Sequence, residues 1–175
     1  MLNVVLYEPE IPQNTGNIMR TCAATNTHLH IIRPLGFVLS ESKLKRSGVN
    51  YIPECKYTLY DDFNDFKSQN PGTYYYFTRY GKKPHSSFNY SNSDENIYLI
   101  FGKESTGIPL EIMRNDLEHC TRIPMSDHVR ALNVSNSVAI AVYEVLRQRN
   151  YEGLLFKEPF KGENYLEGGE QWLIL

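Results

Sequence analysis

Short runs of apolar, β-branched and aromatic residues alternate along the chain with longer amphipathic segments. The short runs end at turn residues or at a charge, which is typical of strands. They predict strands over Leu2 to Tyr7, His28 to Ile32, Thr73 to Thr78, Ile97 to Phe101, and Cys120 to Ile123. Helix-like segments lie between and after them, over Gly16 to Thr25, Asp61 to Ser68, Leu110 to Asp116 and Val134 to Asn150, with a short basic turn around Lys43 to Ser47.

The order of these segments favours the α/β class. Strands that alternate with helices pair in a mostly parallel sheet flanked by helices, and ligands bind in the loops that follow the strands. In the last helix, Val138, Val142 and Val145 repeat at helical spacing, which indicates one face packed in a core or an interface. From Tyr151 the chain is rich in turn residues and ends on apolar ones, so we divide it into a domain over 1–150 and an extension over 151–175.

Composition narrows the class of protein. A chain of 175 residues with 41% hydrophobic residues fits one globular domain. It lacks the run of roughly 20 apolar residues that a membrane helix needs, and its first residues do not resemble a secretory signal. We therefore expect a cytoplasmic protein with no membrane partner. The cysteines, Cys22, Cys55 and Cys120, are widely spaced, which favours free thiols over disulfides or a structural zinc site.

The first candidate site segment runs from Pro9 to Arg20 and reads PEIPQNTGNIMR. Asn14 or Thr15 is a suitable helix cap, and free backbone N–H groups at a helix start bind anions. Arg20 follows on the same helix, from where a guanidinium can reach a phosphate. A capped helix with a solvated arginine explains the same residues about equally well.

The second segment runs from Phe101 to Pro109 and reads FGKESTGIP. Its glycine spacing is neither that of a phosphate-binding loop nor that of a dinucleotide fingerprint, so no nucleoside triphosphate or nicotinamide cofactor is indicated. A glycine turn after a strand lets a ligand approach the backbone, and the Glu104 carboxylate can accept hydrogen bonds there. A surface turn with one glutamate is common, so this segment alone is a weak signal.

The third segment runs from Arg122 to Ala139 and includes RIPMSDHVRALNVSNSVA. Asn133, Ser135 and Asn136 all fall at the start of the long helix, and ordinary capping explains one of them better than three. Ser126, Asp127 and His128 have the residue types of a hydrolase triad. Adjacent residues cannot adopt triad geometry, so a hydrolase is not favoured.

Taken together, the three segments resemble the motifs of the SpoU branch of the SPOUT RNA methyltransferases. Order, spacing and residue identity match over roughly residues 1–150. The resemblance is strongest to the small single-domain 2′-O-methyltransferases of the tRNA wobble nucleotide, the TrmL or YibK type. It implies a SPOUT fold with a C-terminal trefoil knot, an exception to the rule against knots. It also implies an obligate homodimer whose active site draws on both chains.

The resemblance further implies that S-adenosylmethionine is the methyl donor and that no metal takes part. Donor-binding positions are carried over from the family motifs to Phe77, Thr78, Gly102, Ile123, Ala131 and Leu132. Catalytic and RNA-facing positions are carried over to Asn14, Arg20, Glu104 and Asn133, with Tyr143 as a further candidate. A serine is usual in the family where this chain has Ala131, which puts donor affinity or substrate choice in doubt.

The expected reaction is transfer of a methyl group to the ribose 2′-hydroxyl of the wobble pyrimidine of tRNA, and DNA is not expected as a partner. Alternatives are a ribosomal RNA 2′-O-methyltransferase and a silent RNA-binding protein that kept the fold. The net charge of −2 requires a local basic patch for RNA. Candidates are Arg20, Lys43, Lys45, Arg46, Lys103, Arg114 and Arg130. Alternation in a buried strand explains Tyr74 to Tyr76 better than base stacking does.

Overall fold

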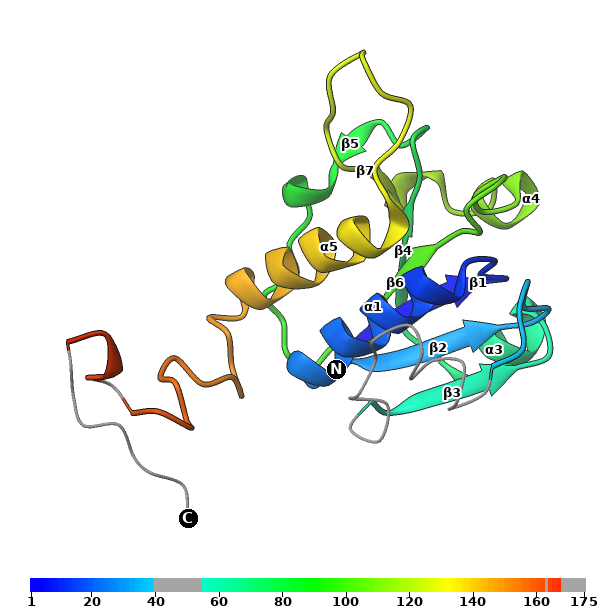
Figure 1. Ribbon diagram of the computed structural model, residues 1–175. Helices are drawn as coiled ribbons and strands as arrows, with labels where there is room; N and C mark the ends of the chain where they lie inside the picture. The colour runs from blue at the N-terminus through cyan, green and yellow to red at the C-terminus, as the bar shows by residue number, and fades with distance from the viewer. Residues whose placement is uncertain (40–54, 163, 168–175) are drawn as a thin grey trace.

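The computed structural model of the chain describes residues 1–39, 55–162 and 164–167. Its centre is a parallel sheet in the order β3-β2-β1-β6-β4-β7-β5 (Figure 1). The strands are β1 (Leu2–Tyr7), β2 (His28–Ile32), β3 (Tyr57–Tyr60), β4 (Thr73–Phe77), β5 (Lys83–Pro84), β6 (Ile97–Phe101) and β7 (Cys120–Arg122). The helices are α1 (Pro12–Ala24), α3 (Phe63–Gln69), α4 (Leu110–Met113) and α5 (Val134–Gln148), with short 3₁₀ turns η2 (His85–Ser87), η3 (Leu117–His119) and η4 (Tyr165–Glu167).

The predicted strands and the parallel α/β class are confirmed, whereas the two edge strands were missed. β3 and β5 have four and two residues, too few for a clear alternation of apolar and polar positions. β3 is held by its pairing with β2, and β5 by its pairing with β7. Tertiary pairing therefore forms these strands where the local sequence gives little signal.

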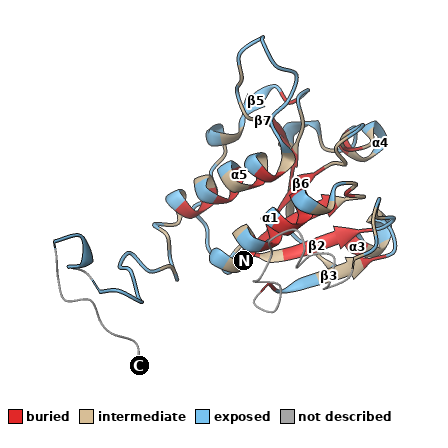
Figure 2. Cartoon of the chain, in the orientation of Figure 1, coloured by how far each residue is buried: buried red, intermediate tan, exposed pale blue. Residues whose placement is uncertain are grey.

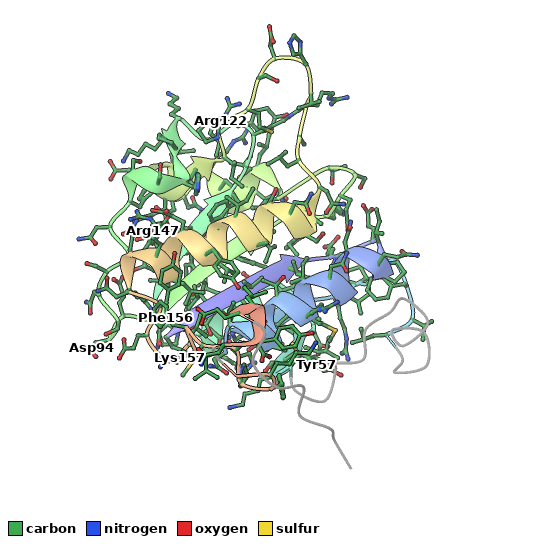
Figure 3. The ribbon with its side chains drawn as sticks, turned by 60° about the vertical axis from the view of Figure 1, so that its left-hand side comes forward. Tyr57, Asp94, Arg122, Arg147, Phe156 and Lys157 are labelled. Atoms are coloured by element: carbon green, nitrogen blue, oxygen red, sulfur yellow. The ribbon has the colours of Figure 1, made fainter. Side chains whose placement is uncertain are left out.

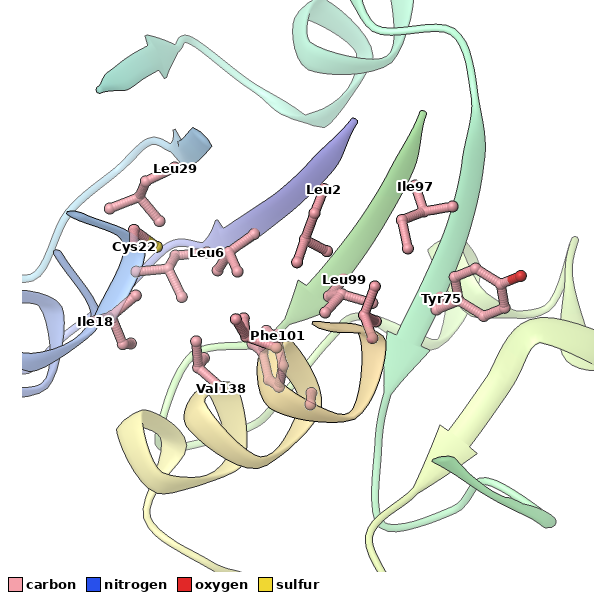
Figure 4. Packing of buried hydrophobic residues seen from close by; sticks show 14 of the residues in the cluster. Leu2, Leu6, Ile18, Cys22, Leu29, Tyr75, Ile97, Leu99, Phe101 and Val138 are labelled. Atoms are coloured by element: carbon pink, nitrogen blue, oxygen red, sulfur yellow. The ribbon is translucent and has the colours of Figure 1, made fainter. Parts of the chain in front are cut away.

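Helices cover both faces of the sheet. Leu2, Leu6, Leu99 and Phe101 point towards α1 and α5, where they meet the buried face of α5 at Val138 (Figure 4). Alternate residues of the same strands, such as Val5 and Ile100, pack on the other face against Phe66 of α3 and Met113 of α4. Figure 2 shows the resulting buried sheet between exposed helix surfaces. The period of two along each strand thus supplies two core layers.

The tyrosines of β4 follow this rule. Tyr75 packs in the layer beneath α1 and α5, and Tyr76 packs in the layer beneath α3 and α4. Burial in the second layer raises the pKa of the Tyr76 hydroxyl well above its ordinary value. Alternation in a buried strand, rather than base stacking, is therefore the correct interpretation. The cysteines Cys22, Cys55 and Cys120 are free and buried, also as expected.

The start of α1 differs from the prediction. The helix begins at Pro12, not at Gly16, and Ile11 is the N-cap. Proline is favourable at the first helical position because its fixed φ suits the helix and its missing N–H would have no helical partner. Asn14 and Thr15 consequently lie inside the first turns rather than at the cap. The predicted short basic turn around Lys43 to Ser47 lies outside the described residues.

Two further features frame the site. A loop over residues 123–133 leaves β7 and returns to the start of α5, and it projects from the body of the protein (Figure 1). After α5, the chain from Tyr151 leads away from the sheet, and most of its described residues are exposed. The trefoil knot and the role of the extension stay predictions.

Candidate functional site

The three sequence motifs meet at the carboxylate of Glu104. One carboxylate oxygen, Oε1, accepts a hydrogen bond of 2.9 Å from Asn14 Nδ2. The other, Oε2, accepts one of 2.9 Å from the backbone N–H of Glu10. Glu104 follows β6, and Asn14 is buried in the first turns of α1. The contact therefore joins the second motif to the first across 90 residues of sequence.

Asn133 of the third motif completes this hydrogen-bonded chain. Its Nδ2 donates to Asn14 Oδ1 at 2.9 Å. Its Oδ1 caps α5 by accepting from the backbone N–H of Ser135 at 2.8 Å, and also from the Ser135 hydroxyl at 2.6 Å. The predicted cap at Asn133 is thus confirmed. The hydrogen-bond partners determine which atom of each side-chain amide is the nitrogen and which is the oxygen. Asn133 therefore donates to Asn14, and Asn14 donates to Glu104.

A second pair of contacts holds the same two loops together. The Glu10 carboxylate accepts hydrogen bonds from the Ser105 backbone N–H and hydroxyl, both at 2.8 Å. These bonds lower the pKa of Glu10. Lys103 Nζ forms an ion pair of 2.7 Å with Glu8, which raises the pKa of Lys103. Sequence reasoning missed these roles because exposed acidic and hydroxyl residues in loops have many possible partners.

The predicted donor-binding positions fall largely along one edge of the sheet, the edge formed by the carboxyl ends of its parallel strands. β6, β4 and β7 are neighbours, and Phe77 is paired with Phe101 and with Thr121. Thr78, Gly102 and Ile123, which follow or nearly follow these strand ends, therefore lie along the same edge. The partly buried side chains of Phe77 and Ile123 offer apolar walls there. Donor binding at these positions stays a prediction.

Gly102 has a clear steric requirement. A Cβ atom added there would lie 2.0 Å from the carbonyl carbon of Gly107 and 2.2 Å from the nitrogen of Ile108. The chain from Gly102 to Gly107 folds back on itself, closed by a hydrogen bond of 2.8 Å from Gly107 N–H to the Lys103 carbonyl. This tight turn directs the Glu104 side chain towards Asn14. The glycine is thus needed for the turn that positions the carboxylate.

Ala131 and Leu132 lie at the end of the 123–133 loop, and both are exposed. They precede Asn133, so the loop returns to the hydrogen-bonded chain at this point. The exposed side chains of the loop, including Asp127 and His128, are on the outside of the molecule (Figure 2).

Arg20 and Tyr143 are both exposed, on helices α1 and α5. Arg20 is exposed on α1, six residues after the buried Asn14. At about 100° per residue, the two side chains are about 120° apart around the helix axis. Tyr143 is 48% exposed on α5, which packs beside α1 (Figure 1). One chain therefore brings together Asn14, Glu104 and Asn133, and presents Arg20 and Tyr143 on its outer surface.

The cations expected to contact RNA have different surroundings. Lys43, Lys45 and Arg46 lie outside the described residues. Lys103 is paired with Glu8, and Arg114 follows α4 on the opposite face of the sheet from α1. Arg130 is exposed in the 123–133 loop.

Comparison with known proteins gives the family. The model of the SpoU rRNA methylase family matches residues 1–143, most of the chain. The chain belongs to the SpoU methylase family. A relative from Escherichia coli K12, named tRNA (cytidine(34)-2′-O)-methyltransferase, is 42% identical over 160 residues, which cover 90% of this chain and all of the relative.

Solved structures of SpoU methylases have the same fold. A Bacillus anthracis protein aligns with a TM-score of 0.85 at 50% identity, over 88% of this chain and 98% of that one. A structure from work on 2-OH methylation of C/U34 on tRNA aligns with a TM-score of 0.79 at 42% identity, covering 86% and 97%. AviRb from Streptomyces viridochromogenes, in complex with AdoMet, has 21% identity and a TM-score of 0.74 over 86% of this chain and 58% of AviRb.

As a SpoU methylase, the protein is an S-adenosylmethionine-dependent methyltransferase. Phe77 and Ile123, partly buried beside the carboxyl ends of β4 and β7, are apolar side chains of the kind that can pack against an adenosyl group. Among the described residues, no group of three or more His, Cys, Asp and Glu side chains is placed to hold a metal ion. In the same part of the chain, no helix is both long and apolar enough to span a membrane.

Proposed function

We propose that this SpoU methylase transfers a methyl group to the ribose 2′-hydroxyl of the wobble pyrimidine, C34 or U34, of tRNA. The main support is the hydrogen-bonded chain from Asn133 through Asn14 to Glu104, which joins all three motifs at the edge where the donor-binding positions lie. The full-length match to the Escherichia coli relative supports tRNA as the substrate.

S-adenosylmethionine supplies the methyl group as a sulfonium, which becomes neutral on transfer. The protein has to hold the hydroxyl in line with that methyl group and to assist loss of the hydroxyl proton. We assign Arg20 chiefly to the adjacent phosphate of the RNA, where its charge lowers the pKa of the hydroxyl. A guanidinium stays protonated in proteins and is a poor base, so direct proton transfer to Arg20 is the less favoured role.

The active enzyme is proposed to be a homodimer. Arg20 and Tyr143 are exposed on α1 and α5, two helices that pack side by side. Ile140, 39% exposed, adds an apolar contact to this surface. A second copy seated there would cover these side chains and would supply an arginine to its partner's hydrogen-bonded chain. The site would then need both protomers.

A methyl-transfer assay with labelled S-adenosylmethionine tests the reaction. Bulk tRNA and ribosomal RNA are offered in parallel, followed by nucleoside analysis. A 2′-O-methylated pyrimidine at position 34, lost in Arg20→Ala and kept in Arg33→Ala, is the expected result. Arg33 is a matched control because it is exposed and paired with Asp61. Labelled ribosomal RNA alone, or donor binding with no transfer to either RNA, would contradict the proposal.

Complementation tests the shared site. Arg20→Ala and Asn133→Ala are each expected to be inactive as homodimers. When the two variant proteins are unfolded together and refolded, half of the dimers contain one chain of each variant. If Arg20 and Asn133 of one site come from different chains, each mixed dimer has one site in which both residues are native. About one quarter of wild-type activity is then expected. No recovery of activity in verified mixed dimers would show that each site uses its own Arg20.

A further inference from the structure

A turn after β4 is locked onto the neighbouring strand β7. The Thr78 backbone N–H donates to the Thr121 carbonyl at 2.9 Å, and Gly81 N–H donates back to the Thr78 carbonyl at 3.2 Å. The Thr121 hydroxyl donates to the Lys83 carbonyl at 3.0 Å. A Cβ at Gly81 would lie 2.4 Å from the Thr121 carbonyl carbon, so only glycine fits here. The turn is therefore rigid at both ends.

This turn presents an aromatic ring and several cations to solvent. Tyr80 is 63% exposed, more than any other tyrosine in the described part of the chain. The guanidinium of Arg79 lies 4.7 Å from the centre of its ring and covers one face. Lys82 and Lys83 follow, both exposed. An exposed aromatic ring held in place beside several cations is an arrangement that suits stacking on an unpaired base.

The surroundings of the turn are positively charged. From Phe66 to Ser93 the sequence contains no acidic residue. Arg122, which is labelled in Figure 3, lies on the adjacent strand β7 and pairs with Pro84 of β5. Arg130 lies in the loop that follows β7. Within residues 1–39, 55–162 and 164–167, none of Arg79, Lys82, Lys83, Arg122 and Arg130 forms an ion pair. The buried Arg122 Nε also has no hydrogen-bond partner in that part of the chain.

The turn is continuous with the site. Thr78, the first residue of the turn, lies at the sheet edge that carries the predicted donor-binding positions. Its backbone N–H donates a hydrogen bond to Thr121, which is two residues before Ile123. The loop from Ile123 leads to Asn133 and so to Asn14. A polyanion whose reacting nucleotide lies at the Glu104 carboxylate can therefore extend over the turn.

We propose that the turn over Arg79–Lys83 binds a single-stranded segment of the substrate RNA, next to the nucleotide that is methylated. Tyr80 stacks on an unpaired base with its open face, and Arg79 and Lys82 contact flanking phosphates. Base–aromatic stacking accepts any base and is worth enough to change affinity several-fold or more. The inference rests on the proposed function, and it assigns to these residues a role in RNA affinity rather than in methyl transfer itself.

Binding of bulk tRNA and of oligouridylate, measured by filter retention, tests this assignment. Tyr80→Ala and Tyr80→Leu are expected to weaken binding on the order of ten-fold, whereas Tyr80→Phe keeps the ring and restores affinity. The loss should fall on KM for tRNA more than on kcat. Lys82→Ala should reduce the slope of log Kd against log salt by about 0.7 to 1.

Matched controls come from other surfaces of the sheet. Tyr57→Ala changes an exposed tyrosine on the opposite edge strand, and Lys67→Ala changes a lysine on α3. Neither should alter RNA binding. If the wild-type protein methylates tRNA and Tyr80→Ala binds RNA as tightly, this inference is overturned while the proposed function stands. If the wild-type protein neither binds nor methylates tRNA, both are overturned.

Discussion

His30 shows how a titratable side chain is kept neutral inside the sheet. Its Nδ1 lies 2.8 Å from the Tyr60 hydroxyl, and its Nε2 lies 3.2 Å from Asn3 Oδ1. Because that amide oxygen can only accept, Nε2 carries the proton and Nδ1 accepts from the tyrosine. Burial, with a smaller contribution from the neighbouring His28, lowers the pKa of His30 from 6.5 to about 3.

This lowered pKa predicts a loss of stability in acid. Between pH 6.5 and about 3 the unfolded chain binds a proton at His30 that the folded protein excludes, so the free energy of unfolding falls as the pH falls. The slope is at most about 1.4 kcal/mol per pH unit. Urea unfolding across this range should show a shallower slope in His30→Gln than in His128→Gln, where the substituted histidine is exposed. Equal slopes would contradict the assignment.

At the scale of elements, the strand-to-turn junction after β6 uses two glycines for different reasons. Gly102 has backbone atoms within 2.6 Å of where a Cβ would lie, whereas Gly107 has open space but a φ of +78°. Gly102→Ala must therefore displace the turn, whereas Gly107→Ala meets only backbone strain of roughly 1 to 2 kcal/mol.

We expect Gly102→Ala to cost clearly more stability than Gly107→Ala and to abolish methyl transfer. Gly107→Asn should be milder than Gly107→Ala, because asparagine tolerates a positive φ. Thermal unfolding with a parallel methyl-transfer assay measures both effects. Equal losses at the two positions would show that the close approach at Gly102 is relieved elsewhere.

Asn133 joins helix stability to the site, and two substitutions separate these roles. Asn133→Ala removes the cap of α5 and should cost about 1 kcal/mol. Asn133→Asp keeps the cap but cannot donate to Asn14 Oδ1. We expect Asn133→Asp to unfold near the wild-type temperature and yet to lose most of its activity. An active Asn133→Asp protein would show that the amide contact is dispensable.

The elements differ in how far the sequence alone predicts them. β1, β6 and α5 have strong apolar patterns and were predicted to within two residues. β3 and β5 depend on partners distant in sequence, and α4 is shorter than predicted because its chain turns after Met113. The motifs single out Asn14 and Glu104 as candidates, but only the fold shows that the two side chains meet. Contacts between loops are absent from any local pattern.

At the scale of the whole molecule, the C-terminal extension leaves large apolar side chains exposed to solvent. Leu155, Phe156 and Phe160 are 78%, 80% and 89% exposed. In Figure 1 this segment leads away from the sheet. Under the proposed homodimer, we expect these apolar side chains to be covered by the partner protomer.

Removal of the residues after Glu152 is therefore expected to weaken self-association while leaving the fold of each protomer intact. Sedimentation at several protein concentrations measures the first effect, and the circular dichroism spectrum measures the second. The double variant Leu155→Ser with Phe156→Ser is a milder test on the full chain. Unchanged dimerisation and thermal stability after truncation would rule out a packing role for the extension.

The strand order also determines when the protein can fold during its synthesis. β1 lies at the centre of the sheet, and its Leu2 pairs with Ile97, which is made 95 residues later. At translation rates of 5 to 20 residues per second, one edge of β1 waits roughly 5 to 20 s for its partner. Until β6 leaves the ribosome, an apolar strand remains open to pairing with other chains. The nascent chain, rather than the finished enzyme, is the form that most needs a chaperone.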